Sequence, residues 1–247
     1  MRKIALLLLA STAICSVGQA QIPNLNTSGV PYTTTYKPNA SQTLDIIQDQ
    51  RGIMYFANDD GVFEYDGINM TLTPMLYALS LAVDNNNVVR VGSSESFGYL
   101  YPNENGVLEY VSMTSQVPDS VPVDPIYKTY CIGDYTYYCS QYNIFIAEQD
   151  SLVKIVDLPK NCFWTYRANG DTLFIGNTDK EEEAFLYYDD QIHYTNISIQ
   201  GVYGLIPWKN GNYLASTGNK LFEISLDGKT PVKDINKTKK QIIALLH

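Results

Sequence analysis

The stretch IIQDQRGIMYFANDDGVFEYDG, residues 46–67, holds three short, mainly apolar runs separated by Asp, Asn and Gly. Runs of four to six residues rich in β-branched and aromatic side chains, with turn residues between them, predict strands joined by tight turns. The runs are too short to be helices of ordinary length. The stretch therefore predicts three consecutive antiparallel strands.

The same order of runs and turns recurs along the chain. A small residue ends each second strand, and counting from Ala57 to Gly92, Cys139, Gly176 and Ser216 gives steps of 35, 47, 37 and 40 residues. Repetition at about 40 residues with four strands per step is the signature of β-propeller blades. The predicted fold is an all-β propeller, an incomplete ring of about five four-stranded blades plus the start of a sixth. The predicted blades are residues 41–74, 78–113, 127–159, 162–198 and 201–234, with 241–247 as that start.

The recurring small residue has a packing reason. Blades pack face to face, and a small side chain lets neighbouring sheets approach, while the polar residue after it can bond the next turn. A β-sandwich is the competing architecture, but it needs about seven strands. We count roughly eighteen in a steady rhythm, which favours the propeller.

The first residues have the layout of a secretory signal peptide. Arg2 and Lys3 precede an apolar run from Ile4 to Ala10, and Gly18-Gln19-Ala20 offers a cleavage site. Residues 1–20 are therefore the predicted signal peptide, and a membrane anchor or a lipid on Cys15 are the alternatives. Residues 21–40 are expected to be extended and could supply a ring-closing strand. The remainder is expected to be exported to the periplasm.

Composition excludes several function classes. The net charge of −9 disfavours nucleic-acid binding, which requires an excess of Lys and Arg. The lysine-containing run 229–240 is interpreted as a solvated edge. Cys131, Cys139 and Cys162 fit no zinc pattern, and there are only two histidines, so no metal and no cofactor are expected. Buried free thiols or a Cys131–Cys139 disulfide both stay open.

The opening stretch resembles the two-component-regulator propeller repeat. The resemblance rests on Ile46–Tyr55 with its Asp-x-x-Gly turn and on Asp60–Gly67 ending in Tyr-Asp-Gly. Gly29–Tyr32 and Glu95–Leu100 also resemble segments of these exported sensors, so the likeness covers 29 to about 115. The sequence departs from the pattern at Leu44, where Trp is common, and in the third blade, which lacks the Asp-x-x-Gly turn.

The resemblance implies a periplasmic ligand-sensing propeller. In such regulators a β-sandwich with a triple-tyrosine motif follows the propellers, then a membrane helix, then a histidine kinase or a helix-turn-helix regulator. The chain is accordingly expected to be the N-terminal sensor part of such a protein, and a complete five-bladed protein is the alternative. Its partners would be an extracytoplasmic small molecule or glycan, and a second copy through the full-length protein. Downstream segments would supply the contact with the membrane.

No catalytic constellation is evident in the sequence. Asp59-Asp60 and Asp189-Asp190 are adjacent pairs, and neighbours on an extended chain point to opposite faces, so neither forms an acid/base pair. His193 lies in a predicted strand, and no Gly-x-Ser-x-Gly elbow occurs. Asp49 is expected to cap a turn. The acidic insert 178–183 is read as a solvated loop, with a cation site as the alternative. We expect no enzyme activity.

Ligand binding is the better supported expectation. The loops that join second to third strands, and those that enter first strands, should share one face of a propeller. Aromatic rings with nearby amides and hydroxyls suit sugar-like ligands. An exported hydrolase acting on carbohydrates and a protein-binding scaffold are the alternatives. The candidate ligand-binding residues are Asn58, Asp59, Ser93, Glu95, Tyr142, Trp164, Arg167, Asn177 and Tyr203.

Overall fold

A computed structural model describes residues 42–159, 162, 164–168, 170–176, 184–195, 197, 202, 204–216, 220–226 and 233–234. The predicted signal peptide, the segment 21–40, the acidic insert and the C-terminal run 241–247 lie outside the described residues. Within the described ranges, no helix is long and apolar enough to cross a membrane.

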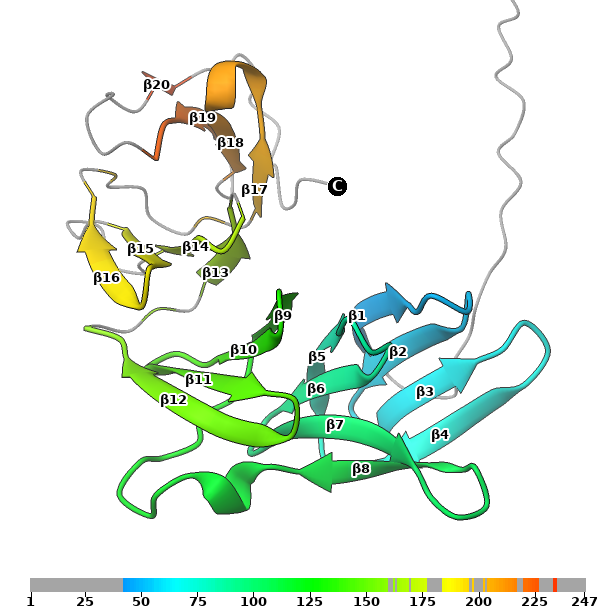
Figure 1. The fold of residues 1–247 in the computed structure, drawn as a ribbon. Coiled ribbons are helices and arrows are strands. Elements are labelled where there is room, and N and C mark those ends of the chain that lie inside the picture. The colour runs from blue at the N-terminus through cyan, green and yellow to red at the C-terminus, as the bar shows by residue number, and fades with distance from the viewer. Residues whose placement is uncertain are drawn as a thin grey trace, which may run out of the picture. The chain divides into compact units, whose positions relative to one another are not determined.

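Five four-stranded antiparallel sheets make up the described chain, and each is a simple meander in which consecutive strands pair (Figure 1). This confirms the all-β prediction and the blade number of about five; the described residues contain no α-helix. The blades are as follows: blade 1 has β1 (Thr43–Gln48), β2 (Met54–Asn58), β3 (Gly61–Tyr65) and β4 (Met70–Pro74); blade 2 has β5 (Ala78–Val83), β6 (Val89–Ser93), β7 (Phe97–Pro102) and β8 (Leu108–Ser112); blade 3 has β9 (Lys128–Ile132), β10 (Tyr135–Cys139), β11 (Asn143–Glu148) and β12 (Ser151–Asp157); blade 4 has β13 (Trp164–Arg167), β14 (Leu173–Gly176), β15 (Phe185–Tyr188) and β16 (Gln191–Tyr194); blade 5 has β17 (Gly204–Pro207), β18 (Tyr213–Ser216), β19 (Leu221–Ile224) and β20 (Lys233–Asp234).

The hydrophobic core lies between blades. Each of four clusters of buried side chains joins two consecutive sheets. In one of them the ring of Phe97 from blade 2 lies 4.7 Å from that of Tyr138 and 4.8 Å from that of Phe145, both in blade 3. Second strands such as β6 are buried on both faces, and in β6 this burial includes Arg90, which pairs with Asp84. A single sheet cannot bury both faces alone, so each blade depends on its neighbours.

Hydrogen bonds tie the first strands of consecutive blades together. The Tyr130 hydroxyl of β9, for example, donates to the Thr165 carbonyl of β13 at 2.6 Å. First strands therefore lie closest to one another where the blades meet. Similar bonds join Leu81 N to Asp45 Oδ2 (2.9 Å) and Ser80 Oγ to Thr129 Oγ1 (2.8 Å). In blade 4, Tyr166 OH donates to the carbonyl of Val202, which precedes β17, at 2.9 Å.

Gly92 shows why a small residue ends the second strand. A Cβ built on Gly92 would lie 2.4 Å from Ile126 Cγ2 and 2.5 Å from Ser80 Oγ. The segment that enters blade 3 thus packs directly against the backbone of β6, and any side chain at this position would have to displace it.

We expect Gly92→Val to lower the free energy of unfolding by about 1–3 kcal/mol through overpacking. Urea denaturation of the variant measures this loss. Shortening the opposing side chain, in the double variant Gly92→Val/Ile126→Ala, should recover part of it, because the two positions share one space. Strictly additive losses would contradict the packing explanation.

The cysteines of the described residues form no disulfide bond. They are Cys131, Cys139 and Cys162, and the last two are buried. Burial raises the pKa of the Cys131 thiol to about 11 and that of Cys139 to about 12. These two thiols therefore stay protonated near neutral pH and are unreactive as nucleophiles. This agrees with the expectation of free thiols and removes the Cys131–Cys139 alternative.

Candidate functional site

The strand ends of blades 1 to 3 define two faces. The loop face holds the turns from second to third strands and the segments that enter first strands. The turn face holds the turns from first to second and from third to fourth strands. The sequence placed candidate ligand residues on the loop face, where one described pocket of about 490 Å³ lies beside Met75, Leu76 and Ser96. Three other described pockets lie at the turn face.

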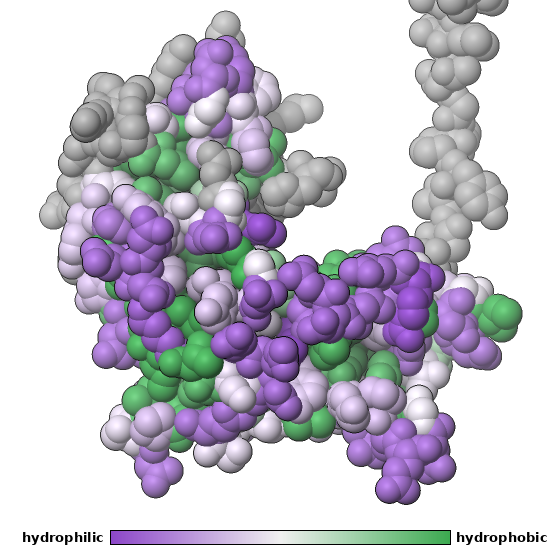
Figure 2. Space-filling view, in the orientation of Figure 1, coloured by the Kyte–Doolittle hydropathy of each residue, from purple (hydrophilic) through white to green (hydrophobic). Residues whose placement is uncertain are grey.

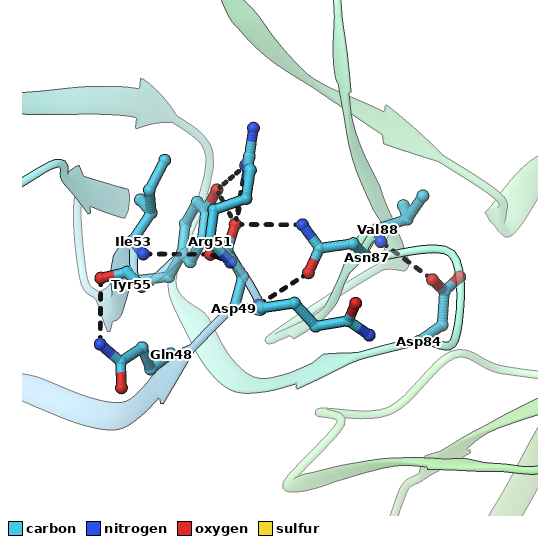
Figure 3. A network of polar contacts seen from close by, with 10 residues as sticks. Gln48, Asp49, Arg51, Ile53, Tyr55, Asp84, Asn87 and Val88 are labelled. Atoms are coloured by element: carbon cyan, nitrogen blue, oxygen red, sulfur yellow. Dashed lines mark hydrogen bonds and ion pairs between the residues drawn. The ribbon is translucent and has the colours of Figure 1, made fainter.

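Asp49 organises the β1–β2 turn on the turn face (Figure 3). Its Oδ1 accepts hydrogen bonds from the backbone N–H groups of Arg51 (2.8 Å) and Ile53 (3.0 Å), and its Oδ2 accepts one from Arg51 Nε (2.9 Å). Gly52 has a φ of +87°, which glycine adopts readily. Burial raises the pKa of Asp49, but the hydrogen bonds from Arg51 and Ile53 outweigh it and hold that pKa below its usual value. The predicted turn-capping role of Asp49 is confirmed.

Blade 2 repeats this turn with different residues. Asp84 Oδ1 accepts hydrogen bonds from the backbone N–H groups of Asn86 and Val88, both at 2.9 Å, and Asp84 Oδ2 pairs with Arg90 at 2.6 Å. Asn87 takes the left-handed position, with a φ of 62°, that glycine takes in blade 1. The equivalence is not evident from the sequence pattern, because Asn87 stands where the Asp-x-x-Gly turn has Gly.

The turn Asn85-Asn86-Asn87 links three blades. Asn87 Oδ1 accepts from Gln50 N at 2.9 Å, and Asn87 Nδ2 donates to Asp49 Oδ2 at 3.4 Å, so one side of the turn binds blade 1 (Figure 3). On the other side, Asn85 Nδ2 donates to the Gly133 carbonyl of blade 3 at 2.7 Å. The exposed Asn86 side chain makes no hydrogen bond to another described residue, and it lines three pockets.

A pocket of about 330 Å³ lies between blades 1 and 2. Residues from three turns and five strands line it, and its apolar surface is larger than its polar surface. Tyr101 has its side chain 59% exposed, which leaves the ring available to a ligand. The residues that line the pocket are Arg51, Tyr55, Glu64, Asn86, Asn87, Val88, Val89, Leu100, Tyr101, Pro102, Gly106 and Leu108. We call it the blade 1–2 pocket.

Three ionisable groups of the blade 1–2 pocket are coupled. Tyr55 and Glu64 are paired across β2 and β3, and Arg51 Nη2 donates to the Tyr55 hydroxyl at 3.0 Å. Arg51 also pairs with Asp49 at 2.7 Å, so its charge is largely balanced inside the protein. Burial raises the pKa of Glu64 above its usual value. The pocket thus contains the guanidinium of Arg51, whose charge is largely neutralised by Asp49, and the partly buried carboxyl group of Glu64.

Two smaller pockets lie between blades 2 and 3 on the same face. In the first, of about 190 Å³, the guanidinium of Arg90 lies 5.1 Å from the ring centre of Tyr99, whose ring meets Tyr101 edge-on at 6.4 Å. Its lining residues are Asn86, Val88, Arg90, Tyr99, Tyr101, Gln149 and Asp150. The second, of about 270 Å³, is lined by Asp84, Asn85, Asn86, Gly133, Asp134, Glu148 and Gln149. No group of side chains in the described residues could hold a metal ion.

Hydrophilic residues cover most of the visible surface around β1, β2 and β5, and hydrophobic residues show in smaller areas (Figure 2). The hydrophilic surface in this region suits a polar ligand.

The predicted ligand residues on the loop face have other roles where the structure describes them. Asn58 is buried, and its Nδ2 donates to the Phe56 carbonyl at 3.2 Å. Ser93 is buried, and its hydroxyl closes the β6–β7 turn, accepting from Ser96 N at 3.1 Å. Both polar groups therefore stabilise the fold. The repeat pattern predicted this role for the polar residue that follows the small residue of each second strand.

The remaining predicted residues are not brought together. Asp59 is half-buried beside Asn58, and Glu95 and Tyr142 are exposed on separate turns of the loop face. Arg167 instead lies at the other end of β13, where its Nε donates to the Gly170 carbonyl at 3.2 Å, so it belongs to the turn face. The four-residue strand separates it from Trp164, which the sequence register had placed beside it. Asn177 and Tyr203 lie outside the described residues, as does the Trp164 side chain.

Comparison with solved structures agrees with this architecture. Virginiamycin B lyase from Staphylococcus aureus is 14% identical with a TM-score of 0.61, and the match covers 81% of this chain and 72% of the lyase chain. The extracellular domain of the hybrid two-component system BT3049 from B. thetaiotaomicron is 17% identical with a TM-score of 0.58, covering 77% of this chain and 29% of that one. The fold is a β-propeller. The resemblance to the two-component-regulator propeller repeat is consistent with the BT3049 match, since that extracellular domain shares the fold.

The extracellular domain of BT4673 from B. thetaiotaomicron is 16% identical and matches 86% of this chain, with a TM-score of 0.48 that supports no inference. This chain spans 35% and 29% of the lengths of the BT4673 and BT3049 structures. No protein-family model matches the sequence, and no curated protein does. Because similar structures include a lyase and the extracellular domain of a two-component system, the fold alone does not decide the function.

Proposed function

We propose that this chain is the ligand-binding propeller of an exported sensor, the N-terminal part of a two-component or helix-turn-helix regulator anchored in the inner membrane. The blade 1–2 pocket carries the proposal, because it joins an exposed aromatic ring, amides and a charged pair in one concave site. The repeat resemblance supports the signalling role. The ligand is an extracytoplasmic small molecule, with glycan fragments as the first candidates.

The composition of the pocket favours binding over hydrolysis. Glu64 is the one carboxylate among the residues that line it. Hydrolysis of a glycosidic bond ordinarily needs two carboxyl groups that flank the bond. Asp49, which pairs with the pocket residue Arg51, already accepts hydrogen bonds from Arg51, Ile53 and Asn87. This arrangement holds a ligand without supplying the acid and base pair that its cleavage requires.

A ligand screen tests the proposal. The purified chain is incubated with a library of glycans, amino acids, nucleosides and organic acids, and each compound that raises the melting temperature is confirmed by calorimetry. We expect at least one compound to bind without being converted, as judged by chromatography. Release of products from a glycan would instead support the hydrolytic alternative, and a library without any binder would contradict ligand sensing by this part of the chain.

Two matched variants locate the binding face. Tyr101→Ala removes an exposed ring from the turn face, and Tyr142→Ala removes one of similar exposure, 44%, from the loop face. Loss of binding in Tyr101→Ala alone supports the blade 1–2 pocket. Loss in Tyr142→Ala alone would return the site to the loop face that the sequence predicted.

A further inference from the structure

We infer that the blade 1–2 pocket recognises an uncharged, hydroxyl-rich ring through Tyr101 and Asn86, and that it excludes ligands carrying carboxylates. The inference rests on the proposed function and assigns both the recognition residues and the charge of the ligand. Two features of the pocket support it. Some of its side chains already pair with other protein groups while others remain exposed, and the charge around the pocket is negative.

Tyr101 and Asn86 present exposed side chains at the pocket. Tyr101 is 59% exposed, and its ring is steadied by the edge-on contact with Tyr99. An aromatic face of this kind packs against the C–H face of a sugar-like ring. Asn86 donates its backbone N–H to Asp84, which fixes the turn, while its side-chain amide stays exposed. An amide offers both a donor and an acceptor, as a hydroxyl-rich ligand requires.

The positive charges near the pocket are already compensated. Arg51 pairs with Asp49 at 2.7 Å, and Arg90 pairs with Asp84 at 2.6 Å. Four further carboxyl groups line the three pockets without a guanidinium partner of their own. They are Glu64 in the blade 1–2 pocket and Asp134, Glu148 and Asp150 between blades 2 and 3. The whole chain has a net charge of −9. A carboxylate brought to this face therefore meets a negative potential, whereas a neutral ligand does not.

The pocket is formed by two blades, so an occupant would contact both. Arg51, Tyr55 and Glu64 belong to blade 1, and Asn86 and Tyr101 belong to blade 2. The same turn is already held against blade 1 by Asn87. A bound ring should therefore stabilise the packing of these blades in addition to filling the pocket.

Calorimetry with charge-matched probes tests the inference. The probes are cellotetraose, mannotetraose and galactotetraose, each with its counterpart in which the primary hydroxyls are oxidised to carboxylates. We expect at least one neutral probe to bind, and its oxidised counterpart to bind at least tenfold more weakly at low ionic strength. Glu64→Gln should reduce this preference. An oxidised probe that binds as tightly as its neutral form would overturn the inference, as would the absence of binding by every neutral probe.

Variants separate recognition from folding. Tyr101→Ala and Asn86→Ala should each lower the affinity for the neutral probe, and Tyr101→Ala should lower it at least tenfold. Neither variant should lower the melting temperature of the free chain. Tyr135→Ala is the matched control, because Tyr135 is 42% exposed at the β9–β10 turn on the same face and lines none of the three pockets. The affinity of Tyr135→Ala for the neutral probe should stay within twofold of that of the unmodified chain. Equal loss in Tyr101→Ala and Tyr135→Ala would overturn the assignment.

The outcomes also distinguish this inference from the proposed function. If the broader library yields a non-carbohydrate ligand that depends on Tyr101, the sensor proposal stands and the assignment of a neutral hydroxyl-rich ring fails. If neutral saccharides bind but depend on Tyr142, ligand sensing stands and the pocket assignment fails.

Discussion

Replacing Arg90 with Met should lower the free energy of unfolding by about 3–5 kcal/mol, the range expected when one partner of a buried ion pair is removed. The side chain of Arg90 is 4% exposed and that of Asp84 is 11% exposed, and the two are 2.6 Å apart. Arg90 Nη1 also donates to the Gln149 carbonyl of blade 3 at 2.6 Å. The variant thus leaves a nearly buried carboxylate without its cation and removes a bond between blades 2 and 3.

Urea denaturation at neutral pH measures the effect of Arg90→Met. The matched control is Lys154→Met, which breaks an ion pair of similar length, 3.0 Å to Asp190, whose side chains are 36% and 78% exposed. Exposed pairs are screened by water, so this variant should change stability little. The double variant Arg90→Met/Asp84→Asn should be more stable than Arg90→Met alone, because it also removes the unpaired charge. Equal losses in Arg90→Met and Lys154→Met would contradict the role assigned to burial.

The sequence predicted the blades because their signal is local. Strands β2 and β6 are buried along nearly their whole length, and each has a small residue, Ala57 or Gly92, just before its last residue. The structure shows that this residue must be small at Gly92. Turn residues mark where each run stops. These features depend on neighbouring residues and on a repeat of about 40, so a single sequence carries them.

The blade 1–2 pocket could not be predicted in the same way. Its residues come from the β1–β2 turn of one blade and from the β5–β6 and β7–β8 turns of the next, and only the packing of the blades brings them together. The signal that could have identified it is Asp84-Asn85-Asn86-Asn87, which aligns with Asp49-Gln50-Arg51-Gly52 once Asn is accepted at the left-handed position. The sequence register placed Arg167 on the loop face, next to Trp164. The two residues lie at opposite ends of β13, so Arg167 reaches the turn face.

Replacing Asp49 with Ala should lower the free energy of unfolding by about 3 kcal/mol, since a hydrogen bond to a charged group contributes roughly 1.5–3 kcal/mol. The Asp49 side chain is fully buried and accepts bonds from two backbone N–H groups of its turn and from Arg51. It also accepts one from Asn87 of blade 2. The matched control is Asp66→Ala, which removes an exposed carboxylate that caps the β3–β4 turn through Ile68 N and Asn69 N. Its loss should be smaller, because Asp66 contacts neither an arginine nor another blade.

The pH dependence of this loss tests its electrostatic origin. The hydrogen bonds from Arg51 and Ile53 hold the pKa of Asp49 below its usual value despite burial, so the unfolded chain binds the proton more readily than the folded one. The contribution of Asp49 is therefore fully present above the unfolded pKa of about 4 and is lost as the pH falls below it. The stability difference between the unmodified chain and Asp49→Ala should be constant from about pH 7 to pH 5 and shrink below about pH 4. A difference that stays constant down to pH 3, or one that grows, would show that Asp49 acts by shape and not by charge.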